Sequence, residues 1–466
     1  MKSFWDWVDR KFSLDPLDVP LIKFSGGRLW TMRNAYEGTL VMGSIGSGKT
    51  SGAGQTLAVA MLRSGFSGIV LCDKKEEPDL WKRYCALTGR TNDLVLFKAG
   101  GHRFNPLEHE TDIFNKVALL QSLMAIESRS RREEDSYWQN ESKKLLENLL
   151  WLAQVLGRPS DLALLSDLMA TAPSDSGQAV SATWLQSSIC GRAVEKANSS
   201  DNLYERRAAK FFTKEFSGGN DRSRTIVKSM VSSIMHTLLR EGIAQHFTGR
   251  STMTPERLIS ERRILVVDLP LEDFKERGAF ANQIWKFCFQ RAVRSRTDHL
   301  PTFLWADEAQ NFLDSEDHDF QATCRSRRCA TIYLTQNHPG LVQRLGEQGT
   351  GMLVGNLTTK IFHRNECEKT RDWASKLIGC RSREKQSETI APDQMGRVTS
   401  RTTHVEREPT FQPEAFEALK SGGPSNGHVV EAVVVYPRGP FNESRARRER
   451  FHQQRPGWAG TVKIST

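Results

Sequence analysis

Short apolar runs alternate with longer amphipathic stretches in the first hundred residues of the chain. The apolar runs are residues 39–42, 68–72 and 93–97, and each is bounded by turn-forming or charged residues. The intervals between the runs are long enough for the crossover helices that parallel strands require. This part of the chain therefore predicts a βαβ arrangement with a parallel sheet.

The same pattern returns after residue 250. Further strands are predicted at 264–268, 302–307 and 330–335, and later runs lie at 352–354 and 428–435. A helix is expected at about 278–296, between the first two of these strands. The two later runs are expected to extend the sheet or to form its edge.

The middle of the chain, residues 110–249, has a different pattern. Its hydrophobic residues are spaced three, four and seven apart, as on one face of a helix. Examples are Val117, Leu119, Leu120, Leu123 and Met124, and then Trp138, Leu145, Leu146, Leu149, Leu150 and Ala153. We expect this portion to form a separate all-helical domain.

Two later segments are polar. Residues 380–412 are rich in Arg, Ser, Thr and Glu with few apolar residues, and they are expected to form a long loop or flap. The end of the chain is basic, with Arg438, Arg445, Arg447, Arg448, Arg450 and Arg455 against Glu443 and Glu449. This end is either a DNA-contacting tail or, as such runs more often are, a solvated end.

Composition narrows the class of protein. The 466 residues carry 65 Lys plus Arg and 55 Asp plus Glu, a formal net charge of +10. This surplus favours a polyanionic partner, although a basic solvated surface would give the same number. No run reaches the roughly eighteen apolar residues that span a bilayer, and residues 1–11 lack the apolar stretch of a signal peptide. We expect a soluble, cytoplasmic protein.

The eight cysteines are scattered and form no C-x-x-C pair, so reduced thiols are expected. A zinc site made of Cys324, Cys329, Cys367 and Cys380 is the alternative, but its spacing is loose for a structural site.

Residues 43–50, of sequence GSIGSGKT, match the P-loop pattern between a predicted strand and a predicted helix. The glycines let backbone N–H groups converge on phosphate oxygens, Lys49 neutralises the β and γ phosphates, and the Thr50 hydroxyl can ligate Mg²⁺. A glycine-rich turn ending in a surface lysine is the alternative. The expected cofactors are ATP and Mg²⁺, and the expected nucleotide-binding residues are Gly43, Ser44, Gly46, Ser47, Gly48, Lys49, Thr50 and Ser51.

A second motif follows the apolar run 302–306, which ends in Asp307 and Glu308. Carboxylates at the carboxyl end of a strand face the ligand crevice of an α/β sheet. Asp307 would hold the metal, and Glu308 would orient the attacking water or accept its proton. Acidic residues that favour a helix dipole are the alternative.

The next strand ends in Gln336, whose amide could bond the γ-phosphate or the water; a simple turn residue is the alternative. Basic residues 325–328 precede that strand. Oligomeric P-loop ATPases often complete the site with an arginine from a neighbouring subunit, although a solvated loop or a DNA-facing patch would look the same.

The spacing of the motifs indicates an insertion. Lys49 and Asp307 are 258 residues apart, whereas βα units of roughly 30 residues each would normally bring such motifs closer together. We expect a RecA-like α/β P-loop ATPase fold with a mostly parallel sheet, interrupted by an inserted all-α domain. The expected segments are 1–108 and 251–440 for the ATPase domain, 109–250 for the insertion and 441–466 for a basic tail.

With these motifs in order, the chain resembles the TraG/TraD-type coupling ATPases of conjugative type IV secretion, in the FtsK/HerA branch of P-loop motor proteins. The resemblance runs from about residue 29 to residue 435. Besides the P-loop and the Asp307-Glu308 pair, it rests on the stretches 73–77 (DKKEE), 104–107 (FNPL), 137–138 (YW), 335–336 (TQ) and 359–371.

The resemblance implies a homo-hexameric ring that uses ATP to move DNA, or a DNA–relaxase complex, toward a secretion channel. By position, Arg325 matches the family's trans-acting arginine and Gln336 its sensor glutamine. Relaxase and secretion-system proteins are the implied partners. Family members usually begin with two membrane-spanning helices, and about 28 residues precede the motor here. Either a membrane-anchoring partner subunit recruits the protein to the inner membrane, or this is a soluble relative.

Two other functions stay open. One is an adaptor ATPase that recruits protein substrates through its helical domain with little DNA translocation. The other is a nucleotide switch that hydrolyses slowly, against which the Asp307-Glu308 pair argues.

Overall fold

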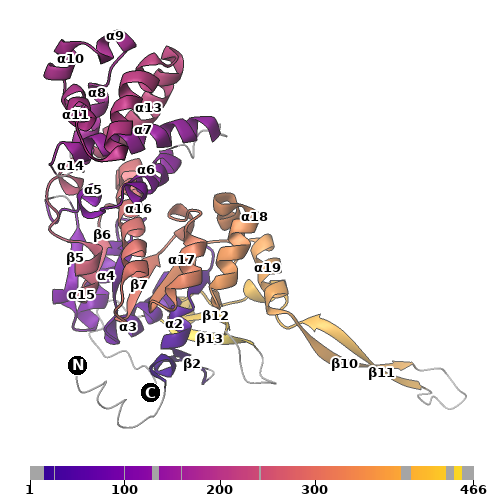
Figure 1. Cartoon of the computed structure of the whole chain (residues 1–466). Coiled ribbons are helices and arrows are strands. Elements are labelled where there is room, and N and C mark those ends of the chain that lie inside the picture. The colour runs from indigo at the N-terminus through magenta and orange to yellow at the C-terminus, as the bar shows by residue number, and fades with distance from the viewer. Residues whose placement is uncertain are drawn as a thin grey trace, which may run out of the picture. The chain divides into compact units, whose positions relative to one another are not determined.

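The computed structural model describes residues 15–25, 27–98, 100–127, 136–158, 160–240, 243–389, 400–436 and 445–453. The chain forms two compact units (Figure 1). The first unit comprises Met1–Phe66, Leu87–Gly89 and Pro301–Thr466, and the second comprises Ser67–Ala86 and Arg90–Leu300.

The first unit is built on a mostly parallel sheet with the strand order β13-β12-β9-β3-β8-β7. The strands are β3 (Thr39–Met42), β7 (Thr302–Ala306), β8 (Cys329–Thr335), β9 (Thr359–Phe362), β12 (Val429–Val435) and β13 (Ala446–His452). Strands β9, β3, β8 and β7 are parallel, whereas β12 and β13 are antiparallel to their neighbours. The central strands are buried on both faces, which explains their continuous apolar sequences.

The register of the central strands positions the site. Met42 at the end of β3 pairs with Thr335 at the end of β8 and with Phe362 at the end of β9. The residues that follow these strands therefore leave the sheet at the same edge. At this edge the chain places the glycine-rich loop and Gln336 next to each other.

Short strands β1 (Pro20–Lys23) and β2 (Leu29–Thr31) form a separate pair in the first unit. The helical segments of this unit are η1 (Pro16–Asp18), α2 (Met32–Tyr36), η2 (Thr50–Gly54), α3 (Gln55–Arg63), η6 (Ala309–Asn311), α17 (Asp317–Cys324), α18 (His338–Asn356), α19 (Glu368–Ile378), η7 (Pro413–Phe416) and η8 (Pro424–Asn426). Segment η2 is a π-helical turn, a rare form that is frequent at functional sites.

The strand expected at 352–354 is wrong, because these residues lie within α18. Leu353 and Val354 are buried and Met352 is exposed, as on one face of a helix. A three-residue apolar run does not distinguish a strand from a buried helix segment.

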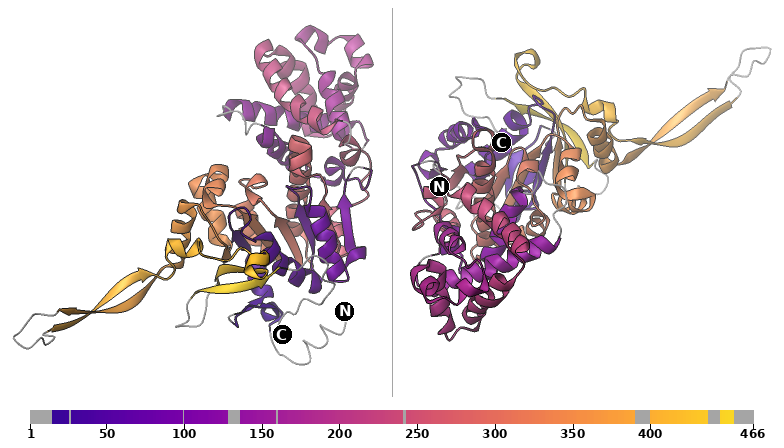
Figure 2. Two further views of the ribbon diagram at one scale, coloured as in Figure 1. Left: turned by 180° about the vertical axis from the view of Figure 1, so that it is seen from behind. Right: turned by 90° about the horizontal axis from the view of Figure 1, so that it is seen from above.

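The loop expected at 380–412 is also wrong for most of its length. Strands β10 (Cys380–Thr389) and β11 (Ser400–Pro409) pair antiparallel along their whole length and form a ribbon that extends away from α19 in both views of Figure 2. Cross-strand ion pairs join Glu408 to Arg381 at 2.9 Å and to Arg383 at 3.5 Å. The sequence did not predict this ribbon because its strands are joined by ion pairs and carry no apolar face. Residues 390–399 lie outside the described residues.

Part of the expected basic tail is a strand. β13 pairs with β12 from Ala446 to His452, and Arg448 Nη2 lies 2.7 Å from the buried Glu431 carboxylate. The alternating burial of β13 is that of an edge strand with one covered face. Arg438 and Arg455 lie outside the described residues.

The second unit contains a parallel sheet of order β4-β6-β5 and the helical insertion. Its strands are β4 (Ser67–Leu71), β5 (Leu94–Phe97) and β6 (Ile264–Val267), with helices α4 (Glu77–Leu87), α15 (Pro255–Ser260) and α16 (Leu271–Ser295). The helical portion contains α5 (Pro106–His109), α6 (Ile113–Glu127), α7 (Ser136–Val155), α8 (Leu162–Ala170), α9 (Ser176–Ala179), α10 (Ala182–Ser187), α11 (Ile189–Asn198), α12 (Leu203–Lys210), η5 (Phe211–Phe216), α13 (Asp221–Leu238) and α14 (Ala244–Phe247). The helices expected in the middle of the chain are thus present, while the expected domain boundaries stay predictions.

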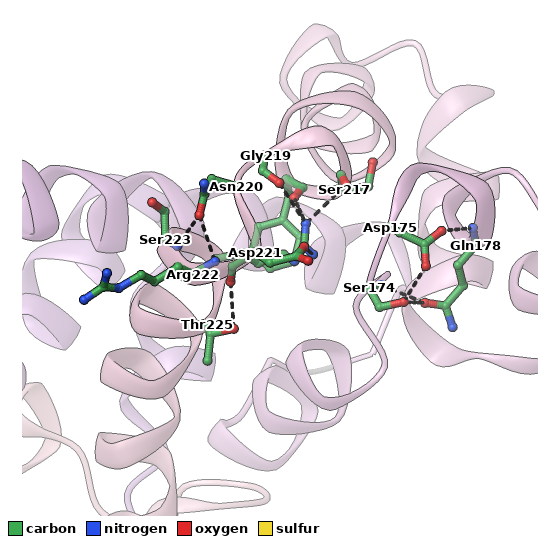
Figure 3. Close-up of polar contacts among 12 residues, drawn as sticks. Ser174, Asp175, Gln178, Ser217, Gly219, Asn220, Asp221, Arg222, Ser223 and Thr225 are labelled. Carbon is green, nitrogen blue, oxygen red and sulfur yellow. Dashed lines mark hydrogen bonds and ion pairs between the residues drawn. The ribbon is translucent and has the colours of Figure 1, made fainter.

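Side-chain caps fix where the helices of this portion begin (Figure 3). The Asn220 side chain accepts hydrogen bonds from Arg222 N and Ser223 N at the start of α13, and Asp175 accepts one from Gln178 N at the start of α9. Such caps satisfy N–H groups that lack partners inside the helix. These caps explain why polar residues between the apolar stretches mark the points where helices begin.

Candidate active site

The glycine-rich loop 43–50 has a conformation that requires its glycines. Gly46 and Gly48 have φ angles of +71° and +82°, which are strained for other residues. A Cβ atom on Gly43 would lie 2.3 Å from Ser47 Oγ, and one on Gly48 would lie 2.7 Å from Val430 Cγ2. Both backbone geometry and space therefore demand the glycines of the expected P-loop.

Two polar groups of this loop fit an anion. The Lys49 side chain is buried, and its Nζ lies 3.4 Å from Glu308 Oε1. Ser47 Oγ is buried and has no hydrogen-bond partner among the described residues. A buried ammonium group and an unpartnered hydroxyl in a glycine loop at a helix start form a phosphate-binding arrangement.

Thr50 and Asp307 lie in direct contact. Thr50 Oγ1 donates a hydrogen bond of 2.6 Å to Asp307 Oδ2, and Glu308 N donates one of 3.0 Å to Asp307 Oδ1. Hydroxyl and carboxylate oxygens are the ligands that Mg²⁺ takes in proteins. These two side chains are the residues that could hold the metal.

The buried Glu308 side chain is the centre of a polar cluster. Its Oε2 accepts hydrogen bonds from Gln336 Nε2 at 3.0 Å and from Gln310 Nε2 at 3.1 Å, while Lys49 faces Oε1. Glu308 has φ +50° and ψ +48°, a left-handed conformation that is rare for glutamate. Strained backbone of this kind is held in place by its surroundings and is typical of functional residues.

Gln310 is a member of this cluster that the sequence interpretation missed. Besides contacting Glu308, its Oε1 accepts a hydrogen bond of 2.7 Å from Thr335 Oγ1 at the end of β8. Gln310 thus joins the segment after β7 to the segment that carries Gln336. The signal was an amide two residues after the acidic pair.

The segment after β9 also reaches the loop, and nothing in its sequence indicated this. Ser44 N donates to Arg364 O at 3.0 Å, and Glu366 N donates to Ser44 Oγ at 3.0 Å. Asn365 Nδ2 donates to Gln336 O at 2.8 Å. The expected site residues Ser44 and Gln336 are therefore linked through residues 364–366.

His363 precedes this segment and is fully buried. Burial and, to a smaller extent, the charge of Lys49 lower the pKa of His363 to about 3. The imidazole is therefore neutral at physiological pH, and it adds no positive charge beside Lys49.

Arg325 has contacts of its own. It lies at the end of α17, and its half-exposed guanidinium is 3.4 Å from Glu37 Oε1, just after α2. The structure thus brings together Lys49, Thr50, Asp307, Glu308 and Gln336, whereas Arg325 contacts a different group. Its role in trans stays a prediction.

Other kinds of site find no support. Among the described residues, no group of three or more His, Cys, Asp or Glu side chains could hold a metal ion, and this includes the cysteine alternative. The eight cysteines all lie in the described part of the chain, and none of them forms a disulfide there. Within the same residues, none of the helices has both the length and the apolar character that a membrane span requires.

The comparisons agree with the resemblance found in the sequence. Residues 301–421 match the family model described as "TraM recognition site of TraD and TraG". No curated protein is similar enough in sequence to match.

The fold matches solved structures over almost the whole chain. The unbound monoclinic form of the bacterial conjugative coupling protein TrwBdeltaN70 has a TM-score of 0.65 and 12% identity, with 97% of this chain and 91% of that chain covered. The plasmid coupling protein TrwB in complex with the ATP analogue ADPNP has a TM-score of 0.60 and 12% identity, with 97% of this chain and 94% of that chain covered. TrwB in complex with ADP and Mg²⁺ has a TM-score of 0.62 and 12% identity, with 97% of this chain and 92% of that chain covered.

These matches confirm the expected α/β P-loop fold and the resemblance to TraG/TraD-type coupling proteins.

Proposed function

We propose that this chain is a coupling-type motor ATPase of the TraG/TraD kind, which binds ATP with Mg²⁺ and hydrolyses it to move DNA or a DNA–relaxase complex. One observation carries the proposal above all others. The cluster of Lys49, Glu308 and Gln336 adjoins the Thr50–Asp307 pair at one edge of the sheet. A phosphate ligand, a metal ligand and a base for water are thus within reach of one another.

The residues have separate tasks in hydrolysis. Lys49 is expected to leave Glu308 for the β and γ phosphates when ATP binds, which frees the Glu308 carboxylate to orient water and accept its proton. Gln336 and Gln310 hold that carboxylate in place through Oε2. Mg²⁺, held by Thr50 and Asp307, would neutralise the charge of the phosphates.

The ligands bound in the related structures and the charge of this chain support the same proposal. TrwB was determined in complex with the ATP analogue ADPNP and with ADP and Mg²⁺. The net charge of +10 suits a DNA partner. A homo-hexameric ring, completed by Arg325 from a neighbouring subunit, and a cytoplasmic location with recruitment to the inner membrane by an anchoring partner are parts of the same proposal.

ATP hydrolysis with and without DNA tests the proposal. The wild-type protein should hydrolyse ATP faster when DNA is added, and the gain should shrink as salt rises. Lys49→Ala and Glu308→Gln should both abolish the stimulated rate. Normal DNA-stimulated turnover in both variants would overturn the assignment of the ATPase site. A wild-type rate that does not change when DNA is added would overturn only the proposal that the protein moves DNA.

An adaptor function is the second candidate. The helical portion exposes large apolar side chains, namely Phe114, Tyr137, Val180, Leu203 and Tyr204. The family model that matches residues 301–421 is described as a TraM recognition site of TraD and TraG. An adaptor would bind a relaxase or another secretion-system protein through apolar contacts, so its binding should persist at high salt while DNA binding falls.

A further inference from the structure

The residue that follows the last described strand, β13, contacts the first residue after the glycine-rich loop 43–50. Gln453 Nε2 donates a hydrogen bond of 2.6 Å to Ser51 Oγ, which lies one residue after Thr50. Gln453 Oε1 accepts a bond of 2.7 Å from Gly423 N. Both polar ends of one side chain are therefore engaged, one by the loop region and one by the segment before β12.

Gly422 provides the space for this side chain. Its φ is +85°, and a Cβ atom at this position would lie 2.3 Å from Gln453 Oε1 and 2.4 Å from Gln453 Cδ. Any larger residue at 422 would therefore push the Gln453 side chain away from Ser51.

The backbone of Gln453 is fixed by the sheet. Gln453 N donates to His428 O at 2.9 Å, directly beyond the last pair of the β12–β13 ladder, Val429 with His452. The amide of Gln453 is thus presented to Ser51 by a strand and not by a free chain end.

An apolar contact supports the same region of the loop. Val430 on β12 is fully buried, and a Cβ atom on Gly48 or on Gly52 would lie 2.7 Å and 3.0 Å from its methyl groups. The carbonyl oxygen of Ser421 lies 3.0 Å from the same point on Gly48. We call Ser421, Gly422, Gly423, Val430 and Gln453 the β12–β13 support.

The support meets the loop where its helical geometry is irregular. Residues Thr50–Gly54 form the π-helical turn η2, in which Gly54 N donates to Lys49 O at 2.8 Å. π-helical turns are rare and occur mostly as single turns within α-helices, frequently at functional sites. Ser51 lies in this turn, so its bond to Gln453 restrains the residues that carry Lys49 Nζ and Thr50 Oγ1.

We infer that Gln453 is a positioning residue of the nucleotide site, which holds the π turn so that Lys49 and Thr50 face the phosphates and the metal. The inference rests on the proposed ATPase function, because it gives β12 and β13 a part in binding the same nucleotide. Gln453 acts on Lys49 and Thr50 indirectly, through its hydrogen bond to Ser51.

The test compares Gln453→Ala with His452→Ala in the full-length protein, because His452 is the exposed neighbour on the same strand. Loss of this partly buried hydrogen bond should raise the KM for ATP and the Kd for ADP about fivefold in Gln453→Ala, with kcat within about twofold. His452→Ala should match the wild type in all three. Equal KM and Kd values for Gln453→Ala and wild type would overturn the inference.

Gly422→Ala provides a second route to the same state, because it leaves Gln453 in the chain but displaces it. Gly422→Ala should raise the Kd for ADP to a similar degree, and the double variant should be no weaker than either single variant. Additive effects, or a fall in the thermal midpoint that alone accounts for the weaker binding, would mean a purely structural role.

Binding of ADP separates this inference from the proposed function. If the wild type binds ADP but hydrolyses no ATP, the ATPase proposal fails while the Kd comparison still decides the role of Gln453. If the wild type binds neither ADP nor ATP, both are overturned.

Discussion

Glu308 Oε1 lies 3.4 Å from Lys49 Nζ, and both side chains are buried. The residue expected to activate water and the residue expected to bind phosphate thus neutralise each other. A buried charge that loses its partner is destabilising. Lys49 therefore needs Glu308 until a phosphate takes the place of the carboxylate beside its ammonium group.

Glu308→Gln should therefore separate binding from hydrolysis. Removal of the base should lower kcat by about 100-fold or more, while ADP binding persists. Because Lys49 then lacks its counter-charge, ADP should raise the thermal midpoint of Glu308→Gln more than that of the wild type. Glu347→Gln, an exposed carboxylate on α18, is the control and should behave as wild type. Equal midpoint shifts would contradict the pairing.

Gln336→Ala and Gln310→Ala should have similar effects, because both amides donate to Glu308 Oε2. Each should lower kcat about tenfold and leave the KM for ATP nearly unchanged, since a misplaced base slows chemistry without weakening phosphate binding. Steady-state kinetics checks this. A rise in KM at constant kcat would instead place the amides on the nucleotide.

Thr50→Ala should weaken metal binding. Loss of one oxygen ligand should raise the Mg²⁺ concentration for half-maximal hydrolysis about tenfold or more, and EDTA should abolish the wild-type rate. Thr323→Ala is the control, since it removes a hydroxyl that donates to the backbone carbonyls of Asp319 and Phe320 in α17. An unchanged Mg²⁺ dependence would exclude Thr50 as a ligand.

Arg325→Ala tests the predicted trans role. The variant should bind ADP and assemble as the wild type does, because the Arg325 guanidinium is half-exposed and its ion pair with Glu37 contributes little to stability. It should nevertheless lose hydrolysis. Mixing it with Lys49→Ala subunits should restore part of the rate, whereas no restoration would favour a role within one subunit. Arg327→Ala is the neighbouring comparison and should keep its rate.

His363 should make stability depend on pH. Because its folded pKa is about 3 and its ordinary value is 6.5, the unfolded chain binds a proton that the folded chain excludes between these values. Its contribution is complete above pH 6.5 and is lost as pH falls toward 3, by about 1.4 kcal/mol per pH unit. Thermal midpoints of wild type and His363→Asn at pH 7 and pH 5 should show a smaller drop for the variant. Parallel drops would rule out His363 as the cause.

The sequence predicted those parts of the site in which local pattern and chemistry coincide. The run 302–306 ends in Asp307 and Glu308, and the structure places both beside the phosphate loop, as strand polarity requires. Gln336 was accessible by the same argument. For Gln310 the sequence offered only an amide two residues after the acidic pair, because its role depends on a left-handed turn at Glu308 that no local pattern encodes.

Long-range pairings account for the remaining differences. Asn365 and Gln453 reach the site only through the order of strands in the sheet, over 29 and 402 residues of chain. The β10–β11 ribbon and strand β13 are rich in charge, so their sequences resemble loops until the partner strand is known. Pairing partners, and not propensity, decided these elements.

The position of Gln453 also bears on how the protein is made. Ser51 leaves the ribosome 402 residues before Gln453, which at 5–20 residues per second is a delay of roughly 20 to 80 seconds. During this interval the phosphate loop exists without the strand that holds its first helical turn. A chain that stops short of Gln453 would then bind nucleotide more weakly than the finished chain, by about the fivefold factor expected for Gln453→Ala.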